Sequence, residues 1–185
     1  RVDANGTPVG QPLAPGYVGL PGAAAPTALS DGRFVLSTFG QSSRVNGPYG
    51  LVQPYSASGV ADGAPAPLHQ DACGTAGAPA ATALPDGGFV VAWGWQCLGD
   101  AELVTRTYRA SGVPVESRVV APGLRDWSLA SLADGRYVLA WTQDANGQPQ
   151  LRARIGDATA PFTLAWQAGR QPLPVAALSG GGFVI

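Results

Sequence analysis

Short apolar runs recur along the chain, each directly after a turn signal of Asp-Gly or Gly-Gly. Four stretches share this pattern: ALSDGRFVLSTF from Ala28, ALPDGGFVVAWGW from Ala83, SLADGRYVLAWTQ from Ser131 and ALSGGGFVI from Ala177. The aromatic residues that follow the turn, spaced 55, 48 and 46 residues apart, are Phe34, Phe89, Tyr137 and Phe183. A self-similar period of this length is typical of propellers, solenoids and repeat arrays.

Each Asp-Gly or Gly-Gly pair predicts a tight hairpin, because a type I′ turn needs positive φ at both central residues. We therefore predict type I′ turns at Asp31-Gly32, Asp86-Gly87, Asp134-Gly135 and Gly180-Gly181. Further turn signals are DANGTPV from Asp3, SASGVAD from Ser56, RASGVPV from Arg109 and DANGQPQ from Asp144. Three hairpin turns in a repeat imply four antiparallel strands. No segment has the hydrophobic spacing of a helix.

The second unit shows the expected strands most clearly. For residues 78–121 they are Pro79–Leu84, Phe89–Gln96, Glu102–Ala110 and Val113–Val120. Alternate positions of the second strand form a bulky face of Phe89, Val91, Trp93 and Trp95, and a small face of Val90, Ala92 and Gly94. Both faces are apolar, so both should be buried, unlike a sheet with one face in water. We expect the bulky face of one sheet to fill the small face of the next.

The predicted fold class is all-β, with repeated four-stranded antiparallel sheets, and our first interpretation is a small β-propeller of about four blades. The single domain, residues 1–185, divides into units of approximately 23–77, 78–121, 122–171 and a composite of 172–185 with 1–22. In the composite blade the N- and C-terminal strands complete one another, within one molecule or by strand exchange and self-assembly between molecules. A β-sandwich and a slice of a longer propeller array are the alternatives.

The combination ALxDGGFVVxW followed by AxGxPV resembles the tandem repeats of large secreted bacterial surface proteins, which often stand beside haemolysin-type calcium-binding repeats and cadherin-like modules. The resemblance covers nearly the whole chain. It implies a propeller-like β-repeat on a secreted or cell-surface protein, and it brings no residue of known role. The acidic Gly-Asp calcium loops of that neighbourhood are missing from this sequence.

Composition narrows the classes of function. The chain has 185 residues, of which 45% are hydrophobic and 12% charged, a balance that favours a folded domain over disorder. The net charge is −1 and no basic run occurs, so the sequence predicts no positively charged surface that could bind nucleic acid. No apolar run approaches the ~20 residues that span a bilayer. The sequence has neither an initiator Met nor a signal-peptide pattern, so we expect a mature chain or a fragment.

Cys73 and Cys97 are the only cysteines. If Leu84 pairs with Phe89 across the hairpin, Cys97 lies opposite Ala76, and Cys73 lies at the same end. A disulfide there closes a loop of 23 intervening residues, and it would stabilise the fold by about 3 kcal/mol in the chain-entropy account. We predict this disulfide and, with it, an oxidising compartment. Two free thiols are the alternative, because a zinc site needs more Cys or His than the chain has.

The sequence offers few groups for catalysis. His69 is the single histidine and could act as a base near Asp71, but no nucleophile elbow accompanies it, so we interpret it as a loop residue. Turn chemistry explains the Asp residues of the hairpins. Glu102 and Glu116 are the only glutamates, and they fall in outer strands or loops rather than together, as a glycosidase would need. The calcium-loop pattern is absent. We predict no catalytic residue, no metal and no cofactor.

Tryptophans are the remaining candidates for binding. Trp93 and Trp141 occupy equivalent positions in the repeat and are assigned to the core. Trp95, Trp127 and Trp166 lie near strand ends or before first strands, where exposed rings could stack on sugars; burial between blades is the alternative. We predict a non-catalytic binding or structural module of a secreted or cell-surface bacterial protein, used for adhesion or protein interaction, with a protein or glycan partner. A carbohydrate-binding propeller is the alternative, and a hydrolase is a distant one.

Overall fold

The computed structural model describes residues 5, 7, 19–42, 48–69, 74–96, 99, 101–122, 124–157, 159–165 and 174–185. These residues form an all-β fold of antiparallel sheets, which confirms the predicted fold class. No helix occurs in the described part of the chain, and hence none that is long and apolar enough to cross a membrane.

Three sheets have four strands each, hydrogen-bonded in sequential order, and a two-stranded hairpin follows them. The first sheet consists of β1 (Gly19–Ala28), β2 (Phe34–Ser42), β3 (Pro48–Tyr55) and β4 (Ala66–Pro67). The second consists of β5 (Gly74–Ala83), β6 (Phe89–Gln96), β7 (Glu102–Tyr108) and β8 (Pro114–Pro122). The third consists of β9 (Leu124–Ser131), β10 (Tyr137–Ala145), β11 (Gln148–Ile155) and β12 (Phe162–Leu164). The hairpin is β13 (Ala176–Ala177) and β14 (Phe183–Val184).

First strands begin earlier than the sequence pattern predicts. The pairing of β5 with β6 shifts in register between Ala76 and Ala80, and it resumes as far as Gly74. A bulge of this kind interrupts the alternation from which a strand is recognised in a sequence. Likewise β1 pairs with β2 from Gly19 onward, so residues 19–22 belong to the first sheet rather than to the composite unit.

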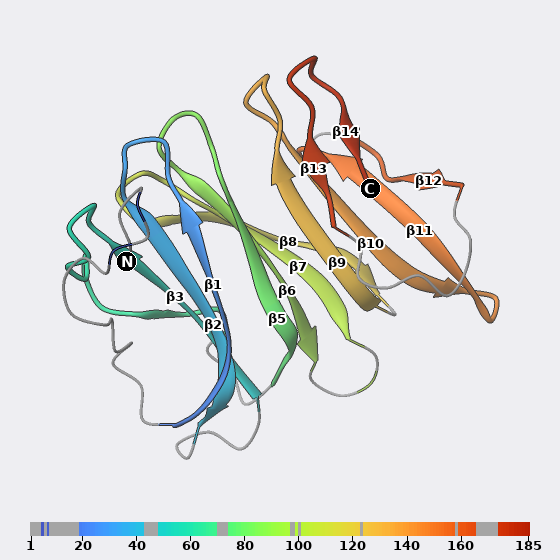
Figure 1. The fold of residues 1–185 in the computed structure, drawn as a ribbon. Helices are drawn as coiled ribbons and strands as arrows, with labels where there is room; N and C mark the ends of the chain where they lie inside the picture. Colours follow the sequence, from blue (N-terminus) through green and yellow to red (C-terminus); the bar gives the residue numbers. More distant parts are fainter. Residues whose placement is uncertain are drawn as a thin grey trace.

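The sheets are arranged as blades (Figure 1). Strand β1 packs against β5, β5 against β9, and β9 against β13, so the first strand of each sheet adjoins the first strand of the next. This radial order is that of a β-propeller rather than of a two-sheet sandwich. The hairpin β13–β14 stands at the end of the row opposite the first sheet. The segment predicted to complete its blade is residues 1–22. Its part up to residue 18 lies outside the described residues except for Asn5 and Thr7, so the composite blade stays a prediction.

Bulky and small faces meet between neighbouring sheets, as predicted. The core between the first and second sheets gathers Leu29, Val35, Val52, Leu68, Phe89, Val91, Trp93, Val104 and Tyr108. The core between the second and third sheets gathers Val90, Ala92, Leu103, Ala121, Leu129, Tyr137, Leu139 and Trp141. The bulky face of β6 therefore meets the first sheet, while its small face receives the bulky face of β10. This complementarity buries both faces of the second sheet.

The predicted turn type is wrong at the first Asp-Gly pair. The backbone N–H of Leu29 donates to the carbonyl of Arg33 at 2.8 Å, and the Leu29 carbonyl accepts from Gly32 at 3.2 Å. Of the central residues, the glycine alone has positive φ, at 85°. The loop is thus a type I turn followed by a left-handed glycine that forms a G1 bulge. Asp31 stabilises it, because its carboxylate accepts the backbone N–H of Arg33 at 3.1 Å.

The other copies repeat this geometry. Their left-handed glycines, with φ of 82°, 88° and 87°, are Gly87, Gly135 and Gly181. The carboxylates of Asp86 and Asp134 accept the equivalent N–H groups at 2.9 and 3.0 Å. A type I′ turn occurs instead at Asn146-Gly147, whose φ values are 53° and 74°. In each Asp-Gly pair the Asp carboxylate therefore accepts a hydrogen bond from the backbone beyond the turn, and only the glycine adopts positive φ.

Candidate binding groove

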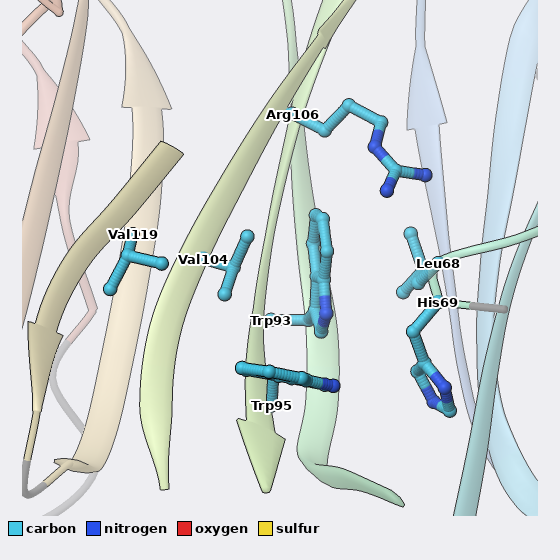
Figure 2. Close-up of a pocket in the computed structure, with 7 residues that line it drawn as sticks. All are labelled: Leu68, His69, Trp93, Trp95, Val104, Arg106 and Val119. Carbon is cyan, nitrogen blue, oxygen red and sulfur yellow. The ribbon is translucent and has the colours of Figure 1, made fainter. Parts of the chain in front are cut away.

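A groove of about 380 Å³ opens between the first and second sheets, on the side of their outer strands. Its lining residues are Leu68, His69, Trp93, Trp95, Val104, Arg106 and Val119. In Figure 2 the two indoles project from β6 toward Leu68 and His69, which follow β4. Arg106 reaches in from β7 at one end of the groove. The volume falls near the lower end of the range of ~300–1,000 Å³ that is usual for ligand pockets.

The groove exists because the two facing sheets differ in the length of their outer strands. Strand β4 has two residues and pairs with β3 only through Pro67 and Ala66, whereas β8 on the second sheet has nine residues. Alternation places Trp93 and Trp95 on the bulky face of β6. Trp93 is 2% exposed, within the core, while Trp95 at its margin is half-buried. Aromatic side chains therefore form the part of the bulky face that remains open.

Two indole N–H donors in the groove lack an acceptor. The Nε1 atoms of Trp93 and Trp95 are both buried, and no described residue accepts a hydrogen bond from either. Both nitrogens lie on the side of the rings that faces Leu68 and His69 (Figure 2). A buried donor left without an acceptor costs about 1–3 kcal/mol. A ligand with acceptor oxygens in the groove would recover that free energy.

Arg106 places a cation over this aromatic cluster. Its guanidinium carbon lies 5.1 Å from the centre of the Trp93 ring, within the range of a cation–π interaction. Its Nε donates to Ser117 Oγ at 2.7 Å, and an Nη donates to the carbonyl of Pro67 at 3.3 Å. Burial raises the pKa of Tyr108, and the nearby Arg106 charge opposes that rise. No carboxylate among the described residues forms an ion pair with Arg106.

The predicted sugar-stacking tryptophans separate in the structure. Trp95 lines the groove, as described above. Trp127 lies on β9, where its ring packs against Gly77 of β5 and joins the core between the second and third sheets. Its environment is therefore the contact between two inner strands. Trp166 lies outside the described residues.

The remaining sequence candidates do not gather into one catalytic site. His69 lines the groove, whereas Asp71, its proposed partner, lies outside the described residues, as do Cys73 and Cys97. Glu116 is on the exposed face of β8, in an ion pair with Arg118 at 2.9 Å. Across the described residues, no three His, Cys, Asp or Glu side chains stand together as a metal site would require.

A second polar cluster lies where the edge of the second sheet meets the third. Arg154 is 7% exposed and forms an ion pair with Asp157 at 3.0 Å. The Tyr137 hydroxyl donates to the same carboxylate, and Arg118 donates to the carbonyl of Asp157 at 3.3 Å. Burial, and then the bond to Asp157, raise the pKa of Tyr137 to about 12. Because these groups bond one another, the cluster joins the two sheets rather than opening toward a ligand.

Sequence reasoning missed most of the groove. Trp93 was assigned to the core alone, and Arg106 was not considered. A signal for Arg106 does exist, since it is a charged residue in the middle of β7, whose only other charged residue is Glu102 at its start. No comparable signal marks Val119 or Leu68, because their place in the groove depends on how two sheets pack.

Comparisons with known proteins reveal a distant likeness to a solved structure. No family model matches the chain, and no curated protein matches it. Among solved structures, the chain is similar to an ulvan lyase of polysaccharide lyase family PL25, bound to -[GlcA(1-4)Rha3S]-. The TM-score is 0.47 with 10% identity, over 76% of this chain and 42% of that chain. This chain thus spans less than half the length of that lyase, and a similarity of this size carries no information about function.

Proposed function

We propose that the domain is a non-catalytic carbohydrate-binding module of a secreted or cell-surface protein, and that sugar binds in the groove between the first and second sheets. The observation that carries the proposal is the half-buried Trp95 beside Trp93, because the indole N–H groups of both have no acceptor among the described residues. The flat face of an indole suits the C–H face of a sugar ring, and the donors suit its hydroxyl oxygens. Few polar groups within a largely apolar concavity are typical of small-ligand sites.

The chemistry of the lining supports binding rather than turnover. Hydrolysis of a glycoside generally needs two carboxyl groups that flank the bond. The described residues that line the groove include no Asp, Glu, Ser or Cys. Positioning by stacking and hydrogen bonding needs none of these carboxylates.

A protein-interaction scaffold is the second candidate function. The observation in its favour is the exposed apolar side of β8 and the turn before it, where Val113, Val115 and Val119 are 54%, 55% and 58% exposed. Strand β8 is an edge strand of nine residues, and the exposed valines on it and before it offer an area to which a protein partner can bind. On this account Trp95 would be dispensable for binding.

A glycan array followed by titration calorimetry tests the proposal. The 185-residue chain is screened first, and the best oligosaccharide is then titrated against Trp95→Ala and a matched control, Phe162→Ala. Phe162 is an exposed aromatic residue on β12, outside the groove. Because a buried aromatic anchor at a binding site contributes about 2 kcal/mol or more, Trp95→Ala should weaken binding by roughly 30-fold, and Phe162→Ala should leave it unchanged. Absence of any saturable sugar ligand, or equal effects of the two substitutions, would contradict the proposal.

A further inference from the structure

Among the described residues that line the groove, the polar side chains present donors far more than acceptors. Trp93 and Trp95 each offer an indole N–H, and an indole has no acceptor in the ring plane. Arg106 offers N–H groups only. His69 is the one lining side chain with a nitrogen that can accept. A neutral sugar hydroxyl is both a donor and an acceptor, so a lining that consists mostly of donors leaves the hydroxyl donor without a partner. A carboxylate or sulfate group presents acceptors alone and therefore fits this lining better.

Among the described residues, Arg106 has no carboxylate partner, unlike several other arginines of the chain. Four arginines form ion pairs with carboxylates near them in the sequence: Arg33, Arg118, Arg136 and Arg154. Two of the five N–H donors of Arg106 are occupied by Ser117 and Pro67, which are uncharged acceptors. A half-buried cation in an apolar groove attracts an anion more strongly than one in open water.

The position of Arg106 is fixed before any ligand binds. Its bond to Ser117 ties it to β8, its bond to Pro67 ties it to β4, and its guanidinium lies over Trp93. Little side-chain entropy is then lost when it contacts an anion, which favours affinity. In Figure 2 Arg106, Trp93 and Trp95 follow one another along the groove, with Trp93 between the other two, so a ligand that contacts both Arg106 and Trp95 passes over Trp93.

We infer that the groove selects an acidic saccharide, in which a carboxylate or sulfate contacts Arg106 and the indole N–H groups while a neighbouring ring stacks on Trp95. This inference rests on the proposed function and names its ligand class. The shared chemistry is an anionic oxygen cluster on a sugar ring, and hydrogen bonds to such groups are roughly twice as strong as neutral ones. A charge-assisted bond of this kind corresponds to about 10- to 100-fold in affinity.

The test compares three oligosaccharides of similar length by titration calorimetry: a neutral galacto-oligosaccharide, an oligogalacturonate and a sulfated galacto-oligosaccharide. The readout is the ratio of acidic to neutral affinity. The wild-type chain should prefer at least one acidic oligomer by 10-fold or more, and this preference should weaken as salt rises. Whichever acidic oligomer binds more tightly identifies the source of the anion.

Three variants locate the effect. Arg106→Gln should reduce the acidic-to-neutral ratio by at least 10-fold, and Arg106→Lys should reduce it less, because the charge is kept but the bidentate fork is lost. Arg109→Gln removes the same charge from an exposed turn outside the groove and should leave the ratio unchanged. Thermal melts check that each variant is folded.

The outcomes separate this inference from the proposed function. Equal affinity for neutral and acidic oligomers, or equal ratios for Arg106→Gln and Arg109→Gln, overturns the acidic ligand class and leaves a carbohydrate-binding module. Binding of none of the three oligomers, together with no ligand on the glycan array, overturns both.

Discussion

Replacing Gly77 by Ala tests the contact between the second and third sheets that Trp127 makes. Gly77 has φ of +84°, which L side chains rarely adopt. A Cβ added there would lie 2.6 Å from Cη2 of Trp127, and 3.3 and 3.4 Å from two further atoms of that ring. The substitution should therefore lower the free energy of unfolding for two reasons, the unfavourable backbone conformation and the overlap of the new Cβ with the Trp127 indole.

A second glycine allows the two costs to be separated. Gly63 has nearly the same φ, +85°, and a Cβ added there would meet no atom within 4 Å. Gly63→Ala should thus cost only the left-handed conformation, about 1 kcal/mol, less the unfolded-state gain of about 0.4–1 kcal/mol. Gly77→Ala adds the cost of overpacking against a ring, about 1–3 kcal/mol. We expect it to lower Tm by roughly 2–12 °C more than Gly63→Ala does, at about 2–4 °C per kcal/mol in a domain of this size.

Reversible thermal or urea unfolding measures both variants, and a double-mutant cycle with Trp127→Ala assigns the difference. In the Trp127→Ala background, Gly77→Ala should cost no more than Gly63→Ala, because the ring that it meets is gone. If the two glycine variants are equally stable in the Trp127 background, the indole does not lie on Gly77.

Further predictions concern other parts of the chain. Cys73 and Cys97 directly flank Gly74 and Gln96, which are partners in the β5–β6 register, so we expect a cross-strand disulfide. Intact mass after alkylation, with and without reductant, checks this prediction, and two alkylated thiols without reductant would refute it. The pKa of Tyr137, raised to about 12 from 10.0, predicts a contribution to stability that is fully present below pH 10 and is lost as the pH rises through 12. The free energy of unfolding of Tyr137→Phe should not show this alkaline loss. The same pH dependence in the variant and in the unsubstituted chain would count against the prediction. If the N-terminal strands complete the last blade, deleting residues 1–13 should lower Tm or change the oligomeric state of the 185-residue chain, and no effect on either would argue against the composite blade.

The sequence was informative where one strand or one turn decides the structure. The bounds and both faces of β6 follow from alternation in FVVAWGWQ alone. The Asp-Gly pairs located the hairpins correctly but with the wrong turn type, because the choice between type I′ and type I with a bulge depends on a side-chain bond to the backbone two residues on, as from Asp31. Local composition does not reveal that bond in advance.

The groove was less predictable because two sheets create it. Trp95 and Trp127 were both candidates for an exposed ring, yet Trp95 lines an opening and Trp127 packs on a glycine of the neighbouring sheet. The difference arises from the bulge in β5 and the shortness of β4. Both are tertiary features, set by segments that lie outside the repeated motif.

The indole N–H signals of a ¹⁵N-labelled chain test the central claim most directly, since they report on the groove and on the alternative tryptophan sites at once. The signals are assigned with single Trp→Phe variants, and the protein is titrated with the tightest oligosaccharide from the panel. The Trp93 and Trp95 signals should shift and become protected from exchange as their N–H groups gain acceptors, while the Trp127 signal stays in place. Saturable binding that leaves Trp93 and Trp95 unmoved would show that the sugar binds elsewhere on the domain.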